Sequence, residues 1–343
     1  MKQRFMIMIC CTAAALALLF LVGCSKAKPD IYIAGYEELD SGKRVAVYWK
    51  NGEKATLSTS DAGSSWAVAI AVSGSDVYVA GLEIPEAGKF HALYWKNGEK
   101  FIISDSPNTT WTSSIAVSGD DVYITGREMN DQAGFTAVHW KNGVRSALSS
   151  EPLSSMAYAV AINDSDVYVA GSDLNGQPPG VKAVYWKNGE RVVLSNSGNA
   201  GASAMTISNS DVYIAGMEDA LGVYWKNGEK TVLTEDNVIT TISSIAVSGS
   251  DVYVSGNEIG SHGRTVAVYW KNGEMTILTE DPNSGMAHDI AVDGSNLYVV
   301  GRDTDSDNVR TAVYWENGKK IPLSRGANVI SAEASSIALV RKK

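Results

Sequence analysis

The sequence has few of the residues on which covalent and metal chemistry depend. Its three cysteines, Cys10, Cys11 and Cys24, all lie within the first 24 residues, so the rest of the chain can form neither a disulfide nor a thiol nucleophile. The four histidines have no metal-ligand spacing: His91, His139, His262 and His288. A glycine-rich phosphate loop and a Ser-His-Asp order are also missing. We therefore expect no metal, no cofactor and no enzymatic activity.

Positive charge is scarce as well. The chain has 29 Lys and Arg against 38 Asp and Glu, a formal net charge of -9. This charge becomes -11 if Lys2 and Arg4 are removed with a leader. Proteins bind nucleic acid largely by neutralising phosphates with Lys and Arg. The composition therefore argues against a nucleic-acid partner.

A long apolar stretch occurs at the N-terminus. It runs from Phe5 to Val22 after Lys2 and Arg4, which is typical of an export signal. The sequence Leu21-Val22-Gly23-Cys24 that follows resembles the lipobox of bacterial lipoprotein precursors. This resemblance implies a signal peptide over residues 1–23, a palmitate-bearing Cys24 and a lipidated tether over 24–29. Alternatively, about eighteen apolar residues could just span a bilayer as an uncleaved anchor.

The rest of the chain is built from seven repeats. Asp-Val-Tyr-Val-Ala-Gly or a near copy begins at residues 30, 76, 121, 166, 211, 251 and 296. Some fifteen residues after each start comes Val-Tyr-Trp-Lys-Asn-Gly or a variant of it. The tryptophans of this second motif are Trp49, Trp95, Trp140, Trp186, Trp225, Trp270 and Trp315. A repeat of 40 to 46 residues indicates a propeller or a solenoid.

Each repeat predicts four short strands, which we name a to d. In the second repeat, strands a, b and c contain Ala67–Val72, Val77–Ala80 and Ala92–Trp95, and strand d follows the Asn97-Gly98 turn. An Asn-Gly pair between apolar runs is a strong hairpin signal. Both alternate sets of positions along strands b and c are apolar, so both faces of each sheet must be buried.

These patterns predict an all-β fold, a seven-bladed β-propeller of four-stranded antiparallel blades over residues 30–343. The repeats begin on strand b at Asp30, and the chain ends on an unpartnered strand a at Ser335–Val340. We therefore expect the C-terminal strand to complete the N-terminal blade, which removes open edges. A parallel β-helix is the alternative, but seven Asn-Gly hairpins argue against it.

The repeat resembles the short uncharacterised propeller repeats of bacterial surface lipoproteins. The motifs Val-Tyr-Val-Ala-Gly and Tyr-Trp-Lys-Asn-Gly carry this resemblance, and the strand order is similar to that of WD40 blades. The likeness implies a propeller and a binding role, without naming a ligand or a reaction. Together with the lipobox it implies export to the cell envelope and attachment to a membrane through lipid, at the outer membrane if the host is Gram-negative.

Antiparallel strands place the a–b and c–d turns on one face, the turn face, and the b–c and d–a loops on the other, the loop face. Because the loop face varies between repeats, we expect any ligand there. Trp66 and Trp111 stand just before strand a, outside the repeated motifs, where Met156 and Met286 occupy the equivalent positions in other repeats. We expect these four residues, with Tyr158 and His288, near the channel mouth; alternatively they fill gaps between blades. The fifth repeat has the shortest b–c loop and should leave a notch.

An acidic residue follows each strand-b glycine by two positions. The seven are Glu37, Glu83, Glu128, Asp173, Glu218, Glu258 and Asp303. A structural role is expected, through loop amides or a cation such as Lys43, Lys89 or Arg310, because buried acids are normally paired. The functional alternative is attraction of cationic partners or metals to the loop face.

Three classes of function remain open from the sequence. The first is a non-catalytic binding or scaffolding lipoprotein with a glycan, peptide or protein ligand. The second is an assembly factor of the cell envelope. The third, which the sequence supports least, is a glycan-active hydrolase or lyase whose site is assembled from distant loops.

Overall fold

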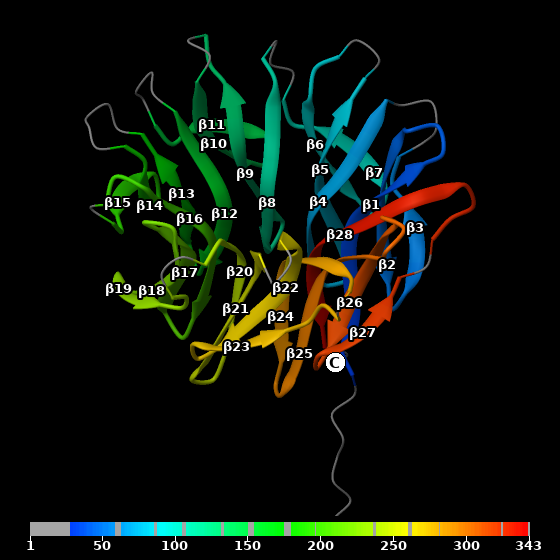
Figure 1. The fold of residues 1–343 in the computed structure, drawn as a ribbon. Coiled ribbons are helices and arrows are strands. Elements are labelled where there is room, and N and C mark those ends of the chain that lie inside the picture. Colours follow the sequence, from blue (N-terminus) through cyan, green and yellow to red (C-terminus); the bar gives the residue numbers. More distant parts are fainter. Residues whose placement is uncertain are drawn as a thin grey trace, which may run out of the picture.

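The repeats form a ring of seven small antiparallel sheets around a central axis (Figure 1). The computed structural model describes residues 28–58, 63–85, 88–104, 108–131, 134–149, 154–174, 180–195, 197–235, 238–259, 263–280, 282–323 and 325–341. No helix in these ranges is long and apolar enough to cross a membrane. The predicted seven-bladed propeller is confirmed.

Blades 2 to 7 are each continuous in sequence, whereas blade 1 combines both ends of the chain. The strands of blade 1, in sheet order, are β28 (Val329–Val340), β1 (Asp30–Leu39), β2 (Arg44–Lys50) and β3 (Glu53–Thr56). Those of blade 2 are β4 (Ser64–Ser73), β5 (Asp76–Ile84), β6 (His91–Lys96) and β7 (Glu99–Ile102). Those of blade 3 are β8 (Thr110–Ser118), β9 (Asp121–Met129), β10 (Phe135–Lys141) and β11 (Val144–Ala147). Those of blade 4 are β12 (Ser155–Asn163), β13 (Asp166–Asp173), β14 (Lys182–Lys187) and β15 (Glu190–Val193).

The remaining blades repeat the same order. Blade 5 contains β16 (Ala200–Ser208), β17 (Asp211–Glu218), β18 (Leu221–Lys226) and β19 (Glu229–Val232). Blade 6 contains β20 (Thr240–Ser248), β21 (Asp251–Ile259), β22 (Thr265–Lys271) and β23 (Glu274–Ile277). Blade 7 contains β24 (Ser284–Asp293), β25 (Asn296–Thr304), β26 (Arg310–Glu316) and β27 (Lys319–Pro322).

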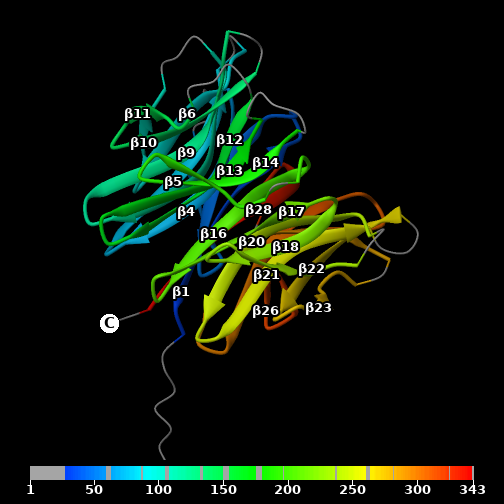
Figure 2. The same ribbon diagram turned by 90° about the vertical axis from the view of Figure 1, so that its left-hand side faces the viewer.

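The C-terminal strand closes the ring, as predicted. β28 pairs antiparallel with β1 along its whole length, from Asp30 opposite Val340 to Leu39 opposite Val329. It therefore begins well before Ser335, where the apolar pattern had placed its start. The start of β1 and the C-terminal end of the chain lie on the same side of the molecule (Figure 2).

Local chemistry repeated in every blade explains the strands. Asn51 and Gly52, in the c–d turn of blade 1, both have positive φ, 51° and 85°, as a type I′ turn requires, and each of the other six Asn-Gly pairs does the same. The tryptophan that precedes each turn is at most 1% exposed and lies in the core between blades. Each repeat therefore carries within its own sequence the turn and the tryptophan that lead both faces of its sheet to be buried.

A bulge in the innermost strand accompanies the glycine of strand b. At Gly81 a Cβ atom would lie 2.2 Å from the carbonyl oxygen of Trp66 and 2.5 Å from the Trp95 ring, so only glycine fits there. Opposite this point the register shifts by one residue, which leaves one residue of strand a unpaired. The same shift occurs in all seven blades, and the unpaired residues are Val68, Ser113, Tyr158, Ser203, Ser243, His288 and Ser335.

Candidate functional site

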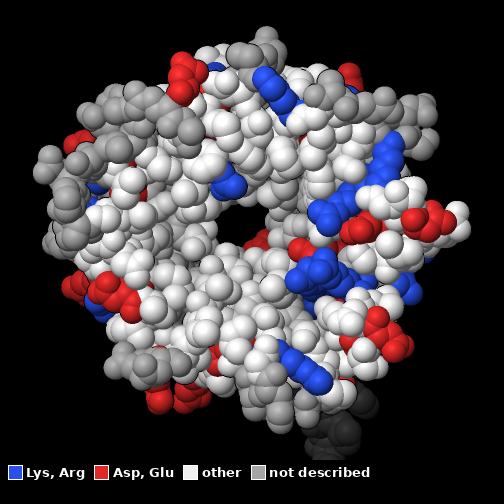
Figure 3. Space-filling model, turned by 45° about the horizontal axis from the view of Figure 1, so that its top comes forward, with Lys and Arg blue, Asp and Glu red and all other residues white. Residues whose placement is uncertain are grey.

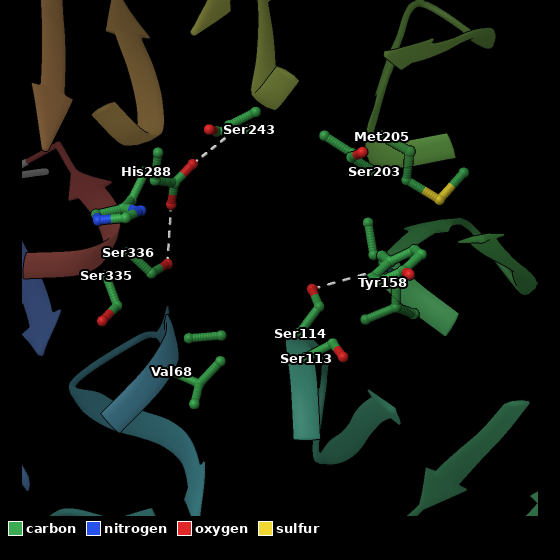
Figure 4. A pocket seen from close by; sticks show the side chains of 16 residues that line it. Val68, Ser113, Ser114, Tyr158, Ser203, Met205, Ser243, His288, Ser335 and Ser336 are labelled. Atoms are coloured by element: carbon green, nitrogen blue, oxygen red, sulfur yellow. Dashed lines mark hydrogen bonds between the residues drawn. The ribbon is translucent and has the colours of Figure 1, made fainter. Parts of the chain in front are cut away.

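The seven bulge residues line the central channel. Together with the residue that follows each of them, they surround a cavity of about 180 Å³ on the axis. Serine is the commonest residue of this wall, whereas Tyr158 of blade 4 and His288 of blade 7 place larger side chains on opposite sides of it (Figure 4). Both predicted residues therefore belong to the channel, and the bulge explains why they point inward.

Asp289 is the carboxylate of the channel wall, and its oxygens hold two blades to blade 7. Its Oδ1 accepts hydrogen bonds from Ser244 Oγ (2.6 Å) and its own blade's Ile290 N (2.8 Å). Its Oδ2 accepts from Ser336 Oγ and Ile337 N, both at 2.9 Å, on β28. Burial raises the pKa of Asp289, and these four donors oppose the rise. The carboxylate thus has a structural task at the closure of the ring.

A second polar cluster lies at the loop-face end of the same junction. Glu333 of β28 contacts His288 Nε2 through Oε1 (3.0 Å) and Arg302 through Oε2 (2.7 Å). Burial alone would raise the pKa of Glu333, but His288 and Arg302 outweigh it and hold the pKa at about 2. Tyr36 donates a hydrogen bond to the same carboxylate (3.2 Å), and burial followed by this negative charge raises the pKa of Tyr36 to about 12. The cluster ties blade 7 to blade 1.

Aromatic rings form a continuous row over blades 2 and 3. Phe90 lies between Trp66 and Trp111, with centroid distances of 5.8 and 5.6 Å, and Phe135 lies 5.5 Å beyond Trp111. All four side chains are half-buried. The structure therefore brings the two predicted tryptophans into one row through a phenylalanine that the sequence analysis did not single out. We call these four residues the aromatic row.

Guanidinium groups lie over the aromatic row at both ends. Arg44 stands 5.1 Å from the centroid of Tyr36 and 5.5 Å from that of Trp66. Arg127 stands 5.0 Å from Trp111 and 5.4 Å from Phe135. Such stacking holds a cation over a ring face.

These cationic and aromatic residues were detectable by aligning the repeats. Phe90 and Phe135 occupy one equivalent position in consecutive repeats, and Arg44 and Arg310 occupy it in two others. Arg127 and Arg302 likewise share a position on strand b, directly after its glycine. In the space-filling view, Lys and Arg side chains gather on one side of the channel opening (Figure 3).

The predicted notch at blade 5 is present. A cavity of about 390 Å³ lies there, between Met156 and Tyr158 of blade 4 and Gly201, Met217 and Ala220 of blade 5. The b–c connection of this blade is only the turn at Asp219 and Ala220, so blade 5 has no b–c loop that extends into the space. Tyr158 lines both the notch and the channel, and its hydroxyl lies 3.1 Å from the Met156 sulfur, a weak acceptor.

The predicted candidate residues therefore separate into three neighbourhoods. Trp66 and Trp111 share the aromatic row, and Met156 and Tyr158 share the notch. His288 belongs to the cluster around Glu333, and Met286 lies beside Arg302, whose Nη2 is 3.1 Å from its sulfur. Cys24, residues 1–27 as a whole and His262 lie outside the described residues.

The acidic ring is largely paired inside each blade. In six blades the acid contacts a Lys or Arg of strand d: Glu37–Lys54, Glu83–Lys100, Glu128–Arg145, Asp173–Arg191, Glu218–Lys230 and Asp303–Lys320, at 2.5 to 2.9 Å. The sequence analysis had suggested Lys43, Lys89 or Arg310 as partners. The pairing cation comes instead from strand d, which lies beside strand c and faces the acid across the sheet.

Glu258 departs from this pattern. Met275 occupies the position that a Lys or Arg holds on strand d of the other blades. Desolvation accordingly raises the pKa of Glu258, and the Thr240 hydroxyl only partly opposes the rise. Within the described residues, no group of three or more His, Cys, Asp or Glu side chains is arranged to hold a metal ion.

Comparison with known proteins yields a fold and no family. No family model matches the chain, and no curated protein matches it. Among solved structures, it is similar to the β-propeller domain of the trilobed protease from Pyrococcus furiosus, with a TM-score of 0.55, 12% identity and coverage of 88% of this chain and 97% of that one. That domain has an open velcro topology, whereas β28 closes the ring here.

Two peptidases are similar over their propeller part. The Mycobacterium tuberculosis puromycin-hydrolyzing peptidase matches with a TM-score of 0.56 and 12% identity, over 88% of this chain and 53% of that one. The Pyrococcus horikoshii acylaminoacyl peptidase matches with 0.54 and 14%, over 88% and 51%. This chain thus spans about half the length of each peptidase. At such identities the likeness shows the fold alone, and a β-propeller supports a binding or scaffold role in general.

Proposed function

We propose that this chain is a membrane-anchored lipoprotein of the cell envelope that acts as a non-catalytic binding propeller. Its ligand is an extended glycan, held across the loop-face mouth of the channel. The observation that carries this proposal is the aromatic row, Trp66, Phe90, Trp111 and Phe135. Half-buried aromatic faces in a row suit the flat faces of successive sugar rings.

The distribution of variation among the blades supports a ligand on the loop face. On the turn face, an Asp at the start of strand b contacts the Asn of the turn in blades 1 to 6. In blades 2 to 6 this Asp also contacts the Lys that ends strand c, as in Asp76, Lys96 and Asn97. At the mouth, the position of Trp66 is occupied by a different residue in most blades. Selection for folding explains a repeated arrangement, whereas a rigid scaffold with one varied end is typical of binding proteins.

The titratable groups of the channel favour binding over catalysis. Asp289 uses both oxygens to bind Ser244 and β28, and Glu333 contacts His288 and is neutralised by Arg302. A general base or nucleophile needs a free position toward the substrate. These groups instead hold blades together.

The contact that precedes β1 supports an anchor below the turn face. Blade 7 lacks the repeated turn-face arrangement, because Asn296 and Glu316 replace its Asp and Lys. Lys28 fills the place of the missing cation, with its Nζ 2.7 Å from Glu316 Oε1. Lys28 is four residues from Cys24, a reach of at most roughly 14 Å. A lipid on Cys24 would therefore keep the turn face toward the membrane and the aromatic row away from it.

A glycan-binding screen tests the function. Full-length protein purified from membranes in detergent is applied to immobilised polysaccharides, beside the double variant Trp66→Ala, Trp111→Ala. Loss of two stacking contacts should weaken binding by about 1–3 kcal/mol, roughly 5- to 150-fold. Phe101→Ala is the matched control, because Phe101 stacks on Tyr94 (5.0 Å), between the two outer strands of blade 2. Glycan binding by the double variant that equals wild-type binding would overturn the proposal. So would a screen in which no glycan binds and the chain captures a protein of the envelope instead.

The anchor is tested separately. Cys24→Ser should abolish incorporation of labelled palmitate and release the chain from the membrane fraction. Retention in the membrane without label would indicate the uncleaved transmembrane segment instead.

A further inference from the structure

Arg127 lies at the channel mouth and has no counter-charge among the residues that the structure describes. Its Nε is buried and has no hydrogen-bond partner. Within the described residues, no carboxylate lies at ion-pair distance from Arg127. The neighbouring Glu128 points to the opposite face of the strand and pairs with Arg145. Two aromatic rings hold the guanidinium of Arg127 in place instead.

Comparison with blade 7 shows that an arginine at this repeat position can have a partner. Arg302 occupies the same repeat position and is neutralised by Glu333 of the next blade in the ring. The position of Glu333 in the blade that follows Arg127 is occupied by Met156, which carries no charge. The same repeat position thus holds an Arg with a carboxylate partner in blade 7 and, within the described residues, an Arg without one in blade 3.

A half-buried cation without a partner is costly, because desolvation is not offset by an opposite charge. Stacking on Trp111 and Phe135 offsets part of this cost and orients the planar group. The terminal nitrogens of a guanidinium bind a carboxylate in a two-point arrangement. A carboxylate supplied by the ligand would complete the site.

We infer that the ligand of the aromatic row is an acidic glycan, a chain of uronic-acid sugars with one carboxylate bound by Arg127. This inference rests on the proposed function and names the class of its ligand. The sugar faces contact the row, and the carboxylate contacts Arg127 beside it. A polyphosphate such as nucleic acid does not fit, because the chain as a whole is acidic.

Oligogalacturonate and its methyl ester provide a matched pair of probes, since the ester keeps the sugar and removes the charge. Binding to the full-length protein in detergent is measured by calorimetry at low and high salt. The acid should bind about tenfold more tightly than the ester, with the difference reduced by salt. Arg127→Gln should abolish that difference. Arg127→Lys, which keeps the charge and loses the planar fork, should retain only part of it.

Arg341→Gln is the control, because it removes the same charge from the opposite face, where Arg341 pairs with Asp293. It should leave the ratio of acid to ester affinity unchanged. Equal affinities for acid and ester, both lost in the Trp66→Ala, Trp111→Ala variant, would overturn the inference and leave the proposed function standing. If neither probe binds and no other glycan binds in the screen, both the inference and the proposed function are overturned.

Discussion

Replacement of Glu333 by Gln should destabilise the closed ring in a pH-dependent way. In the folded protein the pKa of Glu333 is held at about 2, against 4.5 for the unconstrained side chain. A lowered folded pKa means that the stabilisation is complete above pH 4.5 and is lost as the pH falls toward 2. At about 1.4 kcal/mol per pKa unit, the charged form contributes roughly 3 kcal/mol to the free energy of unfolding at neutral pH. The side chain is only 15% exposed, so screening by solvent reduces this value little.

Urea unfolding followed by tryptophan fluorescence between pH 3 and 7 measures the effect. The difference in unfolding free energy between wild type and Glu333→Gln should be close to 3 kcal/mol at pH 7 and should shrink steadily below pH 4.5. Glu38→Gln is the control, because Glu38 pairs with Arg44 near the surface of the same blade and should cost at most about 1 kcal/mol. A loss that stays constant with pH would refute the assignment of this stability to the charge of Glu333.

Three further changes test other parts of the structure. Burial raises the pKa of Asp289 in the folded protein above 3.8, so the stability of wild type relative to Asp289→Asn should fall as the pH rises from 3.8, the reverse of the Glu333 effect. A wild-type urea midpoint that rises with pH relative to that of the variant would contradict this. Met275→Lys gives Glu258 the partner that the other blades have and should raise stability by about 0.5–1 kcal/mol in thermal melts, whereas Met275→Gln should not. Truncation after Ala334 removes the buried Ile337 and two hydrogen-bond donors to Asp289. It should lower the melting temperature by at least about 10 °C. An unchanged melting temperature would mean that β28 does not close the ring.

Repeated signals made the fold predictable from the sequence. The turn at Asn51 and Gly52, the buried Trp49 and the apolar alternation around them each depend on near neighbours in the chain, and each occurs seven times. The closing strand was predictable because the repeats begin on strand b and end on strand a. Its true start at Val329 was not, because Val329–Ala334 carries little alternation of its own and is fixed by pairing with β1.

The sites were predictable only in part. Trp66 and Trp111 stood out because they break the repeat, but Phe90 joins them from the b–c loop and was not recognised. The partners of the acidic ring were assigned to the wrong segment, because strand d reaches the acids only across the sheet. The lack of a partner at Arg127 depends on the identity of a residue in the next blade.

The sequence by itself thus determined the blade, the number of blades and the way the ring closes, because strand periodicity and turn chemistry act over a few residues. Tertiary structure alone decided which seven residues enter the channel, since a one-residue bulge shifts the register of every inner strand. It also decided which charged side chains form ion pairs and which aromatic rings are in contact. Those contacts join residues of different strands or of neighbouring blades, and their distances are set by the packing of strands and blades rather than by any local pattern.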